Sequence, residues 1–265
     1  MKYEKPQKGN PHEPTINQHA FPAKSISRFT DKSGRVEVAL TKAGKVVKLK
    51  PQDQAFCAKR IWNQRAESGY MKSIEDKFQS LAEAILDGRQ KCITPIEDHL
   101  VTEMFALWNL RAHRKENPIE DQKVNAIDVA VKFTKDQQEI MEKNHITTIR
   151  PDLTIAGRDL AGISLQMDID RICEQMHDTE WGVLTAAEGE FIVPDNFSNA
   201  RILPLSPTKC LFSQSKNDTI GRGEVAKLNR LALATSYDHW FARDISKCLN
   251  YMDGHSKRES ACFLL

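Results

Sequence analysis

The stretch MKSIEDKFQSLAEAI, residues 71–85, decides the fold class because the hydrophobic period changes there. Its apolar residues recur every three or four positions, which is the spacing of one face of an amphipathic helix. Gly88 follows at the place where a C-terminal cap is expected. The sequence therefore predicts a helix from about Met71 to Gly88.

The residues before this helix have strand character. Apolar and polar side chains alternate through residues 35–49, and Gly44 lies where the chain would turn, so we predict a β-hairpin there. Residues 1–16 are polar and carry three prolines. We expect them to form a poorly ordered arm.

Three more helices are expected after residue 88. Helical spacing predicts one from about Glu97 to Arg114 and another from Arg158 to His177. Between them, Asn117-Pro118 followed by acidic residues is a start signal. The capping-box spacing at Thr134 would restart or bend that helix.

Strand character returns at Trp181. Residues 181–185 and 191–193 flank a short segment with Gly189 and predict a second hairpin. Residues 201–203 and 210–212 predict further strands, and the prolines between them favour an edge position. A last helix is expected from Gly223 to Tyr237.

Strands, then helices, then strands and a final helix indicate the α+β class, not a parallel βαβ sheet. We predict one compact domain over residues 17–245, with an N-terminal β-hairpin, central helices, C-terminal antiparallel strands and a final helix. Residues 246–265 would form a C-terminal tail.

Composition favours a cytoplasmic protein without a membrane partner. The 265 residues are 40% hydrophobic and 28% charged, as in ordinary globular proteins. The N-terminus lacks a secretory signal, and no apolar run approaches the ~20 residues needed to cross a bilayer. The six cysteines form no Cys-x-x-Cys pair, which argues against a zinc or redox motif. Cys262 starts the bare form of a prenylation box, which we interpret as chance.

The charge is unevenly distributed. Residues 1–65 hold fourteen Lys and Arg against five Asp and Glu, a balance of +9, whereas the rest of the chain has −7. A basic first quarter could contact nucleic acid, an acidic partner or the protein's own acidic remainder, or it could simply be a solvated surface.

Several short segments resemble a family of bacterial and phage proteins catalogued as a domain of unknown function, number four-two-three-eight in that series. Its members begin with a signature like Asn-x-His-Tyr-Val-Pro-Gln. The resemblance covers about residues 15–243, although Ala20-Phe21 replaces Tyr-Val, and Pro194 and Phe197 replace the usual Ser and Pro. It rests on Asn17, His19, Pro22, Arg28-Phe29, Glu75, Arg111, residues 191–196, residues 203–207 and Leu228-Asn229.

The resemblance brings a set of polar residues together. We expect His19, Asp195 and Glu75 to be catalytic, because a His beside carboxylates can act as a general base or help hold a divalent metal. The expected substrate-binding residues are Asn17, Asn196, Asn229 and Arg111. The alternative is structural: His19 and Asn17 would cap a strand and Asp195-Asn196 would turn the chain.

Two functions remain open. The first is a hydrolase, such as a nuclease, that acts on nucleic acid or a nucleotide in the conflict between phage and host, including antiviral defence. The second is a non-catalytic interaction protein of a mobile element, which blocks or senses a host or phage protein. In the second case the basic surface would be the interface.

Overall fold

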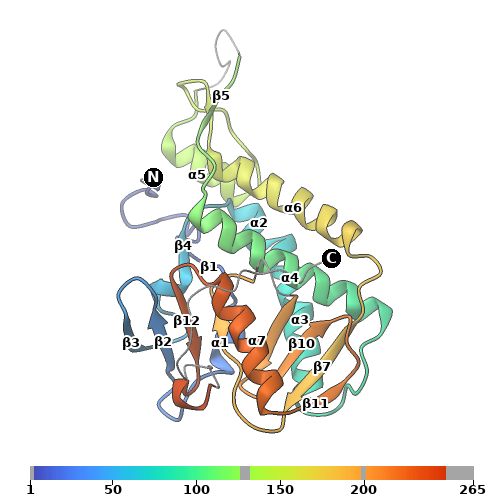
Figure 1. The fold of residues 1–265 in the computed structure, drawn as a ribbon. Coiled ribbons are helices and arrows are strands. Elements are labelled where there is room, and N and C mark those ends of the chain that lie inside the picture. The colour runs from blue at the N-terminus through green and yellow to red at the C-terminus, as the bar shows by residue number, and fades with distance from the viewer. Residues whose placement is uncertain (1–2, 126–131, 198–200, 249–265) are drawn as a thin grey trace.

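Two four-stranded sheets, a layer of long helices and a projecting lobe make up the part of the chain that the computed structural model describes, residues 3–125, 132–197 and 201–248 (Figure 1). The helices are α1 (Ala23–Ser27), α2 (Gln64–Ser68), α3 (Tyr70–Leu86), α4 (Pro95–Glu116), α5 (Lys135–Lys143), α6 (Gly157–Gln175) and α7 (Arg222–Thr235), with short 3₁₀ turns η1 (Gln54–Phe56) and η2 (Ile245–Lys247). The strands are β1 (Asn17–His19), β2 (Val36–Leu40), β3 (Lys45–Leu49), β4 (Cys57–Lys59), β5 (Gln122–Lys123), β6 (Thr154–Ile155), β7 (Trp181–Ala186), β8 (Val193–Pro194), β9 (Ile202–Ser206), β10 (Lys209–Ser213), β11 (Asp218–Ile220) and β12 (His239–Ala242). The α+β class is confirmed.

The predicted N-terminal hairpin is present as β2 and β3, and Gly44 has the left-handed φ of 60° that its turn requires. Its sheet has the order β3-β2-β12-β8, so the hairpin is extended by strands from the far end of the chain. Val38 lies opposite Val47 on one side and Phe241 on the other. This pairing brings residues 239–242 next to the N-terminal quarter.

The second sheet has the order β11-β7-β10-β9. β9 is an edge strand, as its prolines predict. The pairs β7–β10 and β10–β9 are antiparallel, whereas β11 runs parallel to β7, so the C-terminal strands are not all antiparallel as expected.

The predicted hairpin between residues 181–185 and 191–193 is wrong. β7 pairs with β10, and β8 pairs with β12 in the other sheet. The backbone after the turn finds other partners: Phe191 N–H donates to Pro207 O at 2.7 Å, and Glu190 N–H donates to Lys247 O. Tertiary contacts of buried Phe191 therefore override the local turn signal.

The long helices α3, α4 and α6 form where helical spacing predicts them, and Thr134 caps α5 by accepting from Gln137 N–H. The helix predicted to start at Asn117-Pro118 is wrong, because the chain forms β5 there and pairs with β6. Asp121 explains the difference. Its carboxylate accepts from Gly157 N–H at 2.8 Å and so stabilises the start of α6 instead of a helix of its own.

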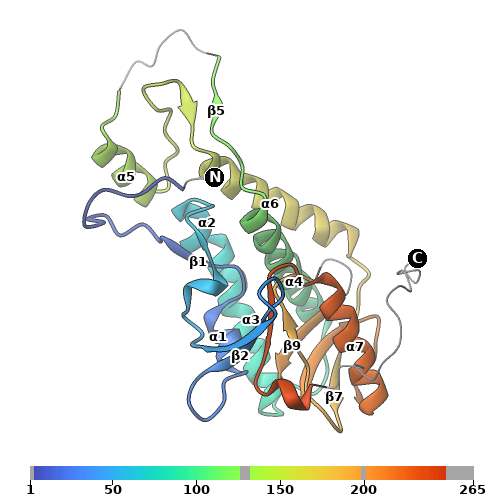
Figure 2. The ribbon, with the colours of Figure 1, turned by 60° about the vertical axis from the view of Figure 1, so that its left-hand side comes forward.

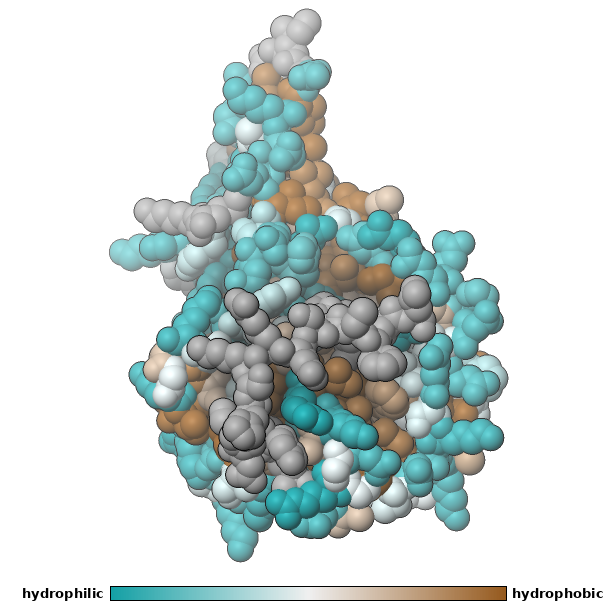
Figure 3. Space-filling model, viewed as in Figure 1, coloured by the Kyte–Doolittle hydropathy of each residue, from teal (hydrophilic) through white to brown (hydrophobic). Residues whose placement is uncertain are grey.

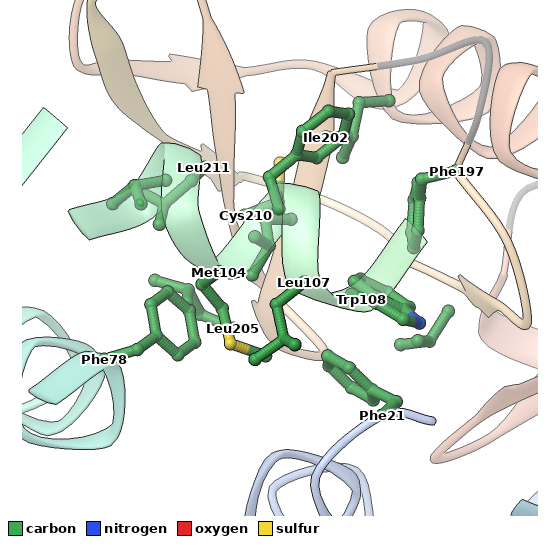
Figure 4. Packing of buried hydrophobic residues seen from close by; sticks show 14 of the residues in the cluster. Phe21, Phe78, Met104, Leu107, Trp108, Phe197, Ile202, Leu205, Cys210 and Leu211 are labelled. Atoms are coloured by element: carbon green, nitrogen blue, oxygen red, sulfur yellow. The ribbon is translucent and has the colours of Figure 1, made fainter. Parts of the chain in front are cut away.

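The core joins residues 17–22, which we call the N-terminal motif, to α4. Figure 4 shows Phe21 against Trp108, with Phe197 beyond the indole. The Phe21 and Trp108 rings stack with centroids 3.9 Å apart, and Phe197 meets Trp108 at 4.2 Å. All three side chains are buried, so this contact fixes the motif against the C-terminal half of α4.

Residues 3–16 form no helix or strand, but they are anchored, which differs from the poorly ordered arm we expected. Gln7 N–H donates to Glu139 at 2.8 Å, and His12 lies 2.7 Å from Asp136 on α5. The arm crosses the base of the lobe formed by β5, α5 and β6, which projects from the body (Figure 2). At the other end, η2 and buried Cys248 extend the packed domain beyond residue 245.

Candidate functional site

The N-terminal motif itself fastens two segments together. Gln18 is 1% exposed; its amide oxygen accepts from Ile61 N–H at 2.7 Å, and its amide nitrogen donates to Trp62 O at 2.7 Å. The imidazole Nε2 of His19 lies 3.2 Å from Pro51 O, and Asn17 accepts from Lys59 Nζ. These contacts tie the β1–β4 ribbon to the chain on either side of it.

Glu75 and Arg111 meet, as the resemblance implies, but in an ion pair. The buried Arg111 guanidinium lies 5.4 Å from the centroid of the Trp62 ring and donates to His19 O at 3.2 Å. The structure therefore brings Glu75 and Arg111 to the backbone of His19. This geometry holds β1 in place.

The Asp195 carboxylate accepts three backbone N–H groups, from residues 237, 238 and 239, at 2.7 to 3.2 Å. Asn196 accepts from Thr235 Oγ1 through its backbone oxygen. Asn229 is 1% exposed; it accepts from Ile192 N–H at 3.1 Å and donates to Glu190 O at 2.8 Å. These contacts connect loops and strands, as the structural alternative expects.

A small pocket lies where the N-terminal motif, the end of α4 and β12 meet, and we call it the aromatic pocket. Its volume is about 20 Å³. It is lined by Ala20, Phe21, Phe56, Trp108, Ala112, Lys115, Glu116, Pro194, Asp195, Tyr237, His239 and Phe241. Of the seven expected site residues only Asp195 lines it; the other six lie outside its wall. Ala20 and Phe21 nevertheless place the motif beside Asp195.

His239 is the titratable group of the aromatic pocket that is most deeply buried, at 5% exposure. Burial lowers the pKa of its imidazole, so the ring is neutral at pH 7. Its Nδ1 lies 3.8 Å from Asp195 Oδ2, which is too long for a hydrogen bond but close enough to stabilise a positive ring. A neutral, buried imidazole next to a carboxylate can accept a proton.

The pKa of Glu116 shifts in the direction opposite to that of His239. Partial burial of its carboxyl and then the neighbouring Asp238 carboxylate raise the pKa of Glu116. Lys42 Nζ lies 2.5 Å from Asp238, and its hydrogen bond lowers the pKa of Asp238. Of the two carboxyl groups, Glu116 is therefore the one that takes up a proton first as the pH falls.

Sequence reasoning missed His239 and Glu116. The segment Tyr237-Asp238-His239-Trp240-Phe241 has aromatic residues around an acid and a base, which was the available signal for a site. Glu116 gives no such signal in the sequence, because a Glu at the end of a charged helix is common in proteins without a site there. Its role depends on Asp238, which is 122 positions away in the chain.

The described residues contain no evident ligand set for the divalent metal that the polar residues could help to hold. Across residues 3–125, 132–197 and 201–248, no group of three or more His, Cys, Asp and Glu side chains gathers closely enough to hold an ion. The described cysteines are all free thiols, and burial strongly raises the pKa of the Cys210 thiol. The Cys262 box lies outside the described residues.

Part of the basic first quarter pairs with the protein's own acidic remainder. Lys24 lies 2.6 Å from Glu83, Lys42 pairs with Asp238, and Arg60 pairs with Glu142 at 2.6 Å. These are the internal contacts that the charge asymmetry permits. Binding of nucleic acid by this region stays a prediction.

Comparison with family models, with curated proteins and with solved structures gives no match to this chain. The resemblance drawn from short sequence segments therefore stays a prediction. Within the described part of the chain, none of the helices has the length and apolar character needed to span a membrane.

Proposed function

We propose that the protein is a hydrolase whose acid and base groups are Glu116 and His239 in the aromatic pocket. One observation carries the proposal: a histidine whose pKa is lowered and a carboxyl whose pKa is raised line the same small cavity. Environments that push two titratable groups in opposite directions are typical of general acid and base pairs.

The geometry suggests how the groups would act. A cavity of about 20 Å³ is large enough to hold a water molecule. His239 would take a proton from this water as the oxygen attacks the substrate, and the Asp195 carboxylate would stabilise the imidazolium that forms. Glu116 would protonate the leaving group as its bond to the substrate breaks. Exchange with solvent would then remove the proton from His239 and return one to Glu116, so that protons balance over the cycle.

For the substrate we propose a nucleotide or nucleic acid. Aromatic side chains form much of the wall, and Tyr237 is 50% exposed beside it, so a planar base could stack at the opening. A nuclease or nucleotide hydrolase in the cytoplasm would also suit a role in phage–host conflict. The free thiols of the described cysteines are consistent with that compartment.

The test is hydrolysis of nucleoside phosphates and of single- and double-stranded DNA and RNA, followed by mass spectrometry of the products. Glu116→Gln and His239→Gln should each lower turnover about 100-fold or more. Matched changes at exposed sites, Glu174→Gln and His99→Gln, should leave turnover unchanged. Circular dichroism checks that each variant folds. Full turnover in the folded Glu116 and His239 variants, or no turnover of any of these substrates by the unaltered protein, would reject the proposal.

The lobe favours the second candidate, an interaction protein. Ile140 is 39% and Ile146 is 51% exposed, and Figure 3 shows apolar surface running along the lobe among polar groups. Such residues suit contact with a host or phage protein. If Ile146→Ser abolished the biological effect while hydrolysis was unchanged or absent throughout, this alternative would replace the first.

A further inference from the structure

A second cavity, of about 360 Å³, lies near the end of α4, on the segment that follows the helix. Lys115 and Glu116 line the aromatic pocket, whereas residues 118–121 line this one. We call it the arginine pocket, because three guanidinium groups from separate segments contribute to its wall. They belong to Arg60 after β4, Arg150 before β6, and Arg158 in the first turn of α6.

A carboxylate of the arm lines the arginine pocket and contacts its guanidinium groups. Glu4 Oε2 lies 2.5 Å from Arg150 Nη2 and also binds Arg158 Nη1. Arg60 Nη1 donates to the backbone oxygen of Glu4 at 3.1 Å. Burial opposes the charge of Glu4, but Arg158 and Arg150 outweigh it and lower the pKa of this carboxyl. Glu4 therefore acts as an anionic ligand supplied by the protein itself.

Without Glu4 the three guanidinium groups would keep only two carboxylates in direct contact. Arg60 and Arg158 share Glu142, at 2.6 and 2.9 Å, and Arg150 pairs with Asp121. Three guanidinium groups thus face two directly paired carboxylates. Their side chains are only 1% (Arg60), 10% (Arg158) and 16% (Arg150) exposed, and a buried charge without a partner is costly. Glu4 is thus the third carboxylate in direct contact with these guanidinium groups, and Glu120 lies in the same wall.

The arm that supplies this anion has other anchors of two kinds. It has no regular structure; Gln7 bonds the buried Glu139, whereas the contacts with Asp136 through Gln7 and His12 are on the surface. Surface ion pairs contribute little stability. An external anion that binds the same arginines could therefore displace the arm.

We propose that the arginine pocket binds the phosphate group of a phosphate monoester, and that Glu4 occupies the site until this ligand replaces it. Guanidinium groups match phosphate oxygens with paired, charge-assisted hydrogen bonds. Because the arm and the ligand compete for the same groups, each weakens the binding of the other by the same factor. The inference stands on these contacts alone and does not depend on the hydrolase proposal.

The test is calorimetric titration with inorganic phosphate and with adenosine monophosphate, at constant ionic strength. Glu4→Gln should bind both at least about fivefold more tightly than the unaltered protein, because it removes the competitor. Arg150→Gln should lose most of the affinity. Glu13→Gln makes the same change elsewhere on the arm, at an exposed residue, and should behave like the unaltered protein. Tighter binding of adenosine monophosphate than of phosphate would support the monoester as the ligand, because the ester group then adds contacts.

Displacement of the arm gives a second readout. Phosphate should speed trypsin cleavage after Lys8, and Asp136→Asn, which weakens the arm without altering the pocket, should raise phosphate affinity by less than Glu4→Gln does. Circular dichroism establishes that each variant is folded. Equal phosphate affinity in Glu4→Gln and the unaltered protein, or no measurable binding by either, would overturn the proposal.

Discussion

The two pockets near the end of α4 show how burial acts on charged groups with and without partners. In the aromatic pocket, apolar side chains lie beside His239 and Glu116, and burial moves both pKa values toward the uncharged forms. In the arginine pocket the side chains are also withdrawn from water, but opposite charges keep Arg158 and Glu4 ionised. β4 lies between Phe56 at one pocket and Arg60 at the other, a span of about 13 Å at strand spacing. Uncharged forms are thus favoured on one side and charged pairs on the other.

The largest loss of stability should come from breaking a buried ion pair at the arginine pocket. Glu142→Gln leaves Arg60 buried without its main partner and should lower the free energy of unfolding by about 3–5 kcal/mol, measured by urea denaturation. Lys72→Gln is the control, because it removes an exposed pair with Asp76 and should change stability little. Similar losses in the two variants would contradict the idea that burial distinguishes the pairs.

A smaller loss is expected from the packing beneath the arginine pocket. A Cβ at Gly162 would clash with Asn63 Oδ1, and Asn63 both caps α2 and donates to Asp159. Gly162→Ala should therefore cost about 1–3 kcal/mol in thermal or urea unfolding. Gly223→Ala meets no neighbouring atom and should be neutral or slightly stabilising. A larger loss of stability in Gly223→Ala than in Gly162→Ala would be inconsistent with this close approach.

On the aromatic side, stability should depend on pH through His239. Its pKa is lower in the folded protein than in the unfolded chain, so its contribution is complete above the ordinary value of 6.5 and is lost as pH falls through the folded value. The loss is about 1.4 kcal/mol for each unit between the two pKa values. His239→Gln should flatten the unfolding free energy between pH 8 and 5. His99→Gln, at an exposed site, should keep the original slope.

The smallest expected effect is a change in the pKa values of the neighbouring carboxyl groups of Glu116 and Asp238. Lys42→Gln removes the hydrogen bond that lowers the pKa of Asp238, so the pKa of Asp238 should rise toward that of Glu116. Carbon-13 NMR of the two carboxyl groups measures this directly. Unchanged titration of both would show that Lys42 does not lower the pKa of Asp238.

Local pattern predicted the long helices and the first hairpin well. Ile74 and Phe78 repeat at helical spacing, and Gly44 provides a turn conformation, so these elements need no information from elsewhere in the chain. The pairing of β8 with β12 was not predictable, because buried Val193 fits either sheet and only tertiary contacts decide between them. Asp121 likewise carries a helix-start signal that serves the distant α6.

The candidate site was less accessible to sequence reasoning. The motif around His19 and the residues around Asp195 do meet, through Phe21 and Pro194, but the polar side chains expected to be functional mostly hold backbone groups. A carboxylate that accepts backbone N–H groups and one that faces a substrate look identical in a sequence. The difference lies in neighbours such as Asp238 beside Glu116, which only the fold supplies.

The pairing of β2 with β12 also has a consequence during synthesis. Val38 pairs with Phe241, so this pairing cannot form until about 200 further residues have been synthesised. At a translation rate of about 5–20 residues per second this takes roughly 10–40 s, during which β2 presents an open strand edge on the nascent chain. Ribosomes that stall before residue 239 would therefore release chains prone to aggregate, and a chaperone that covers β2 would be most useful in that interval.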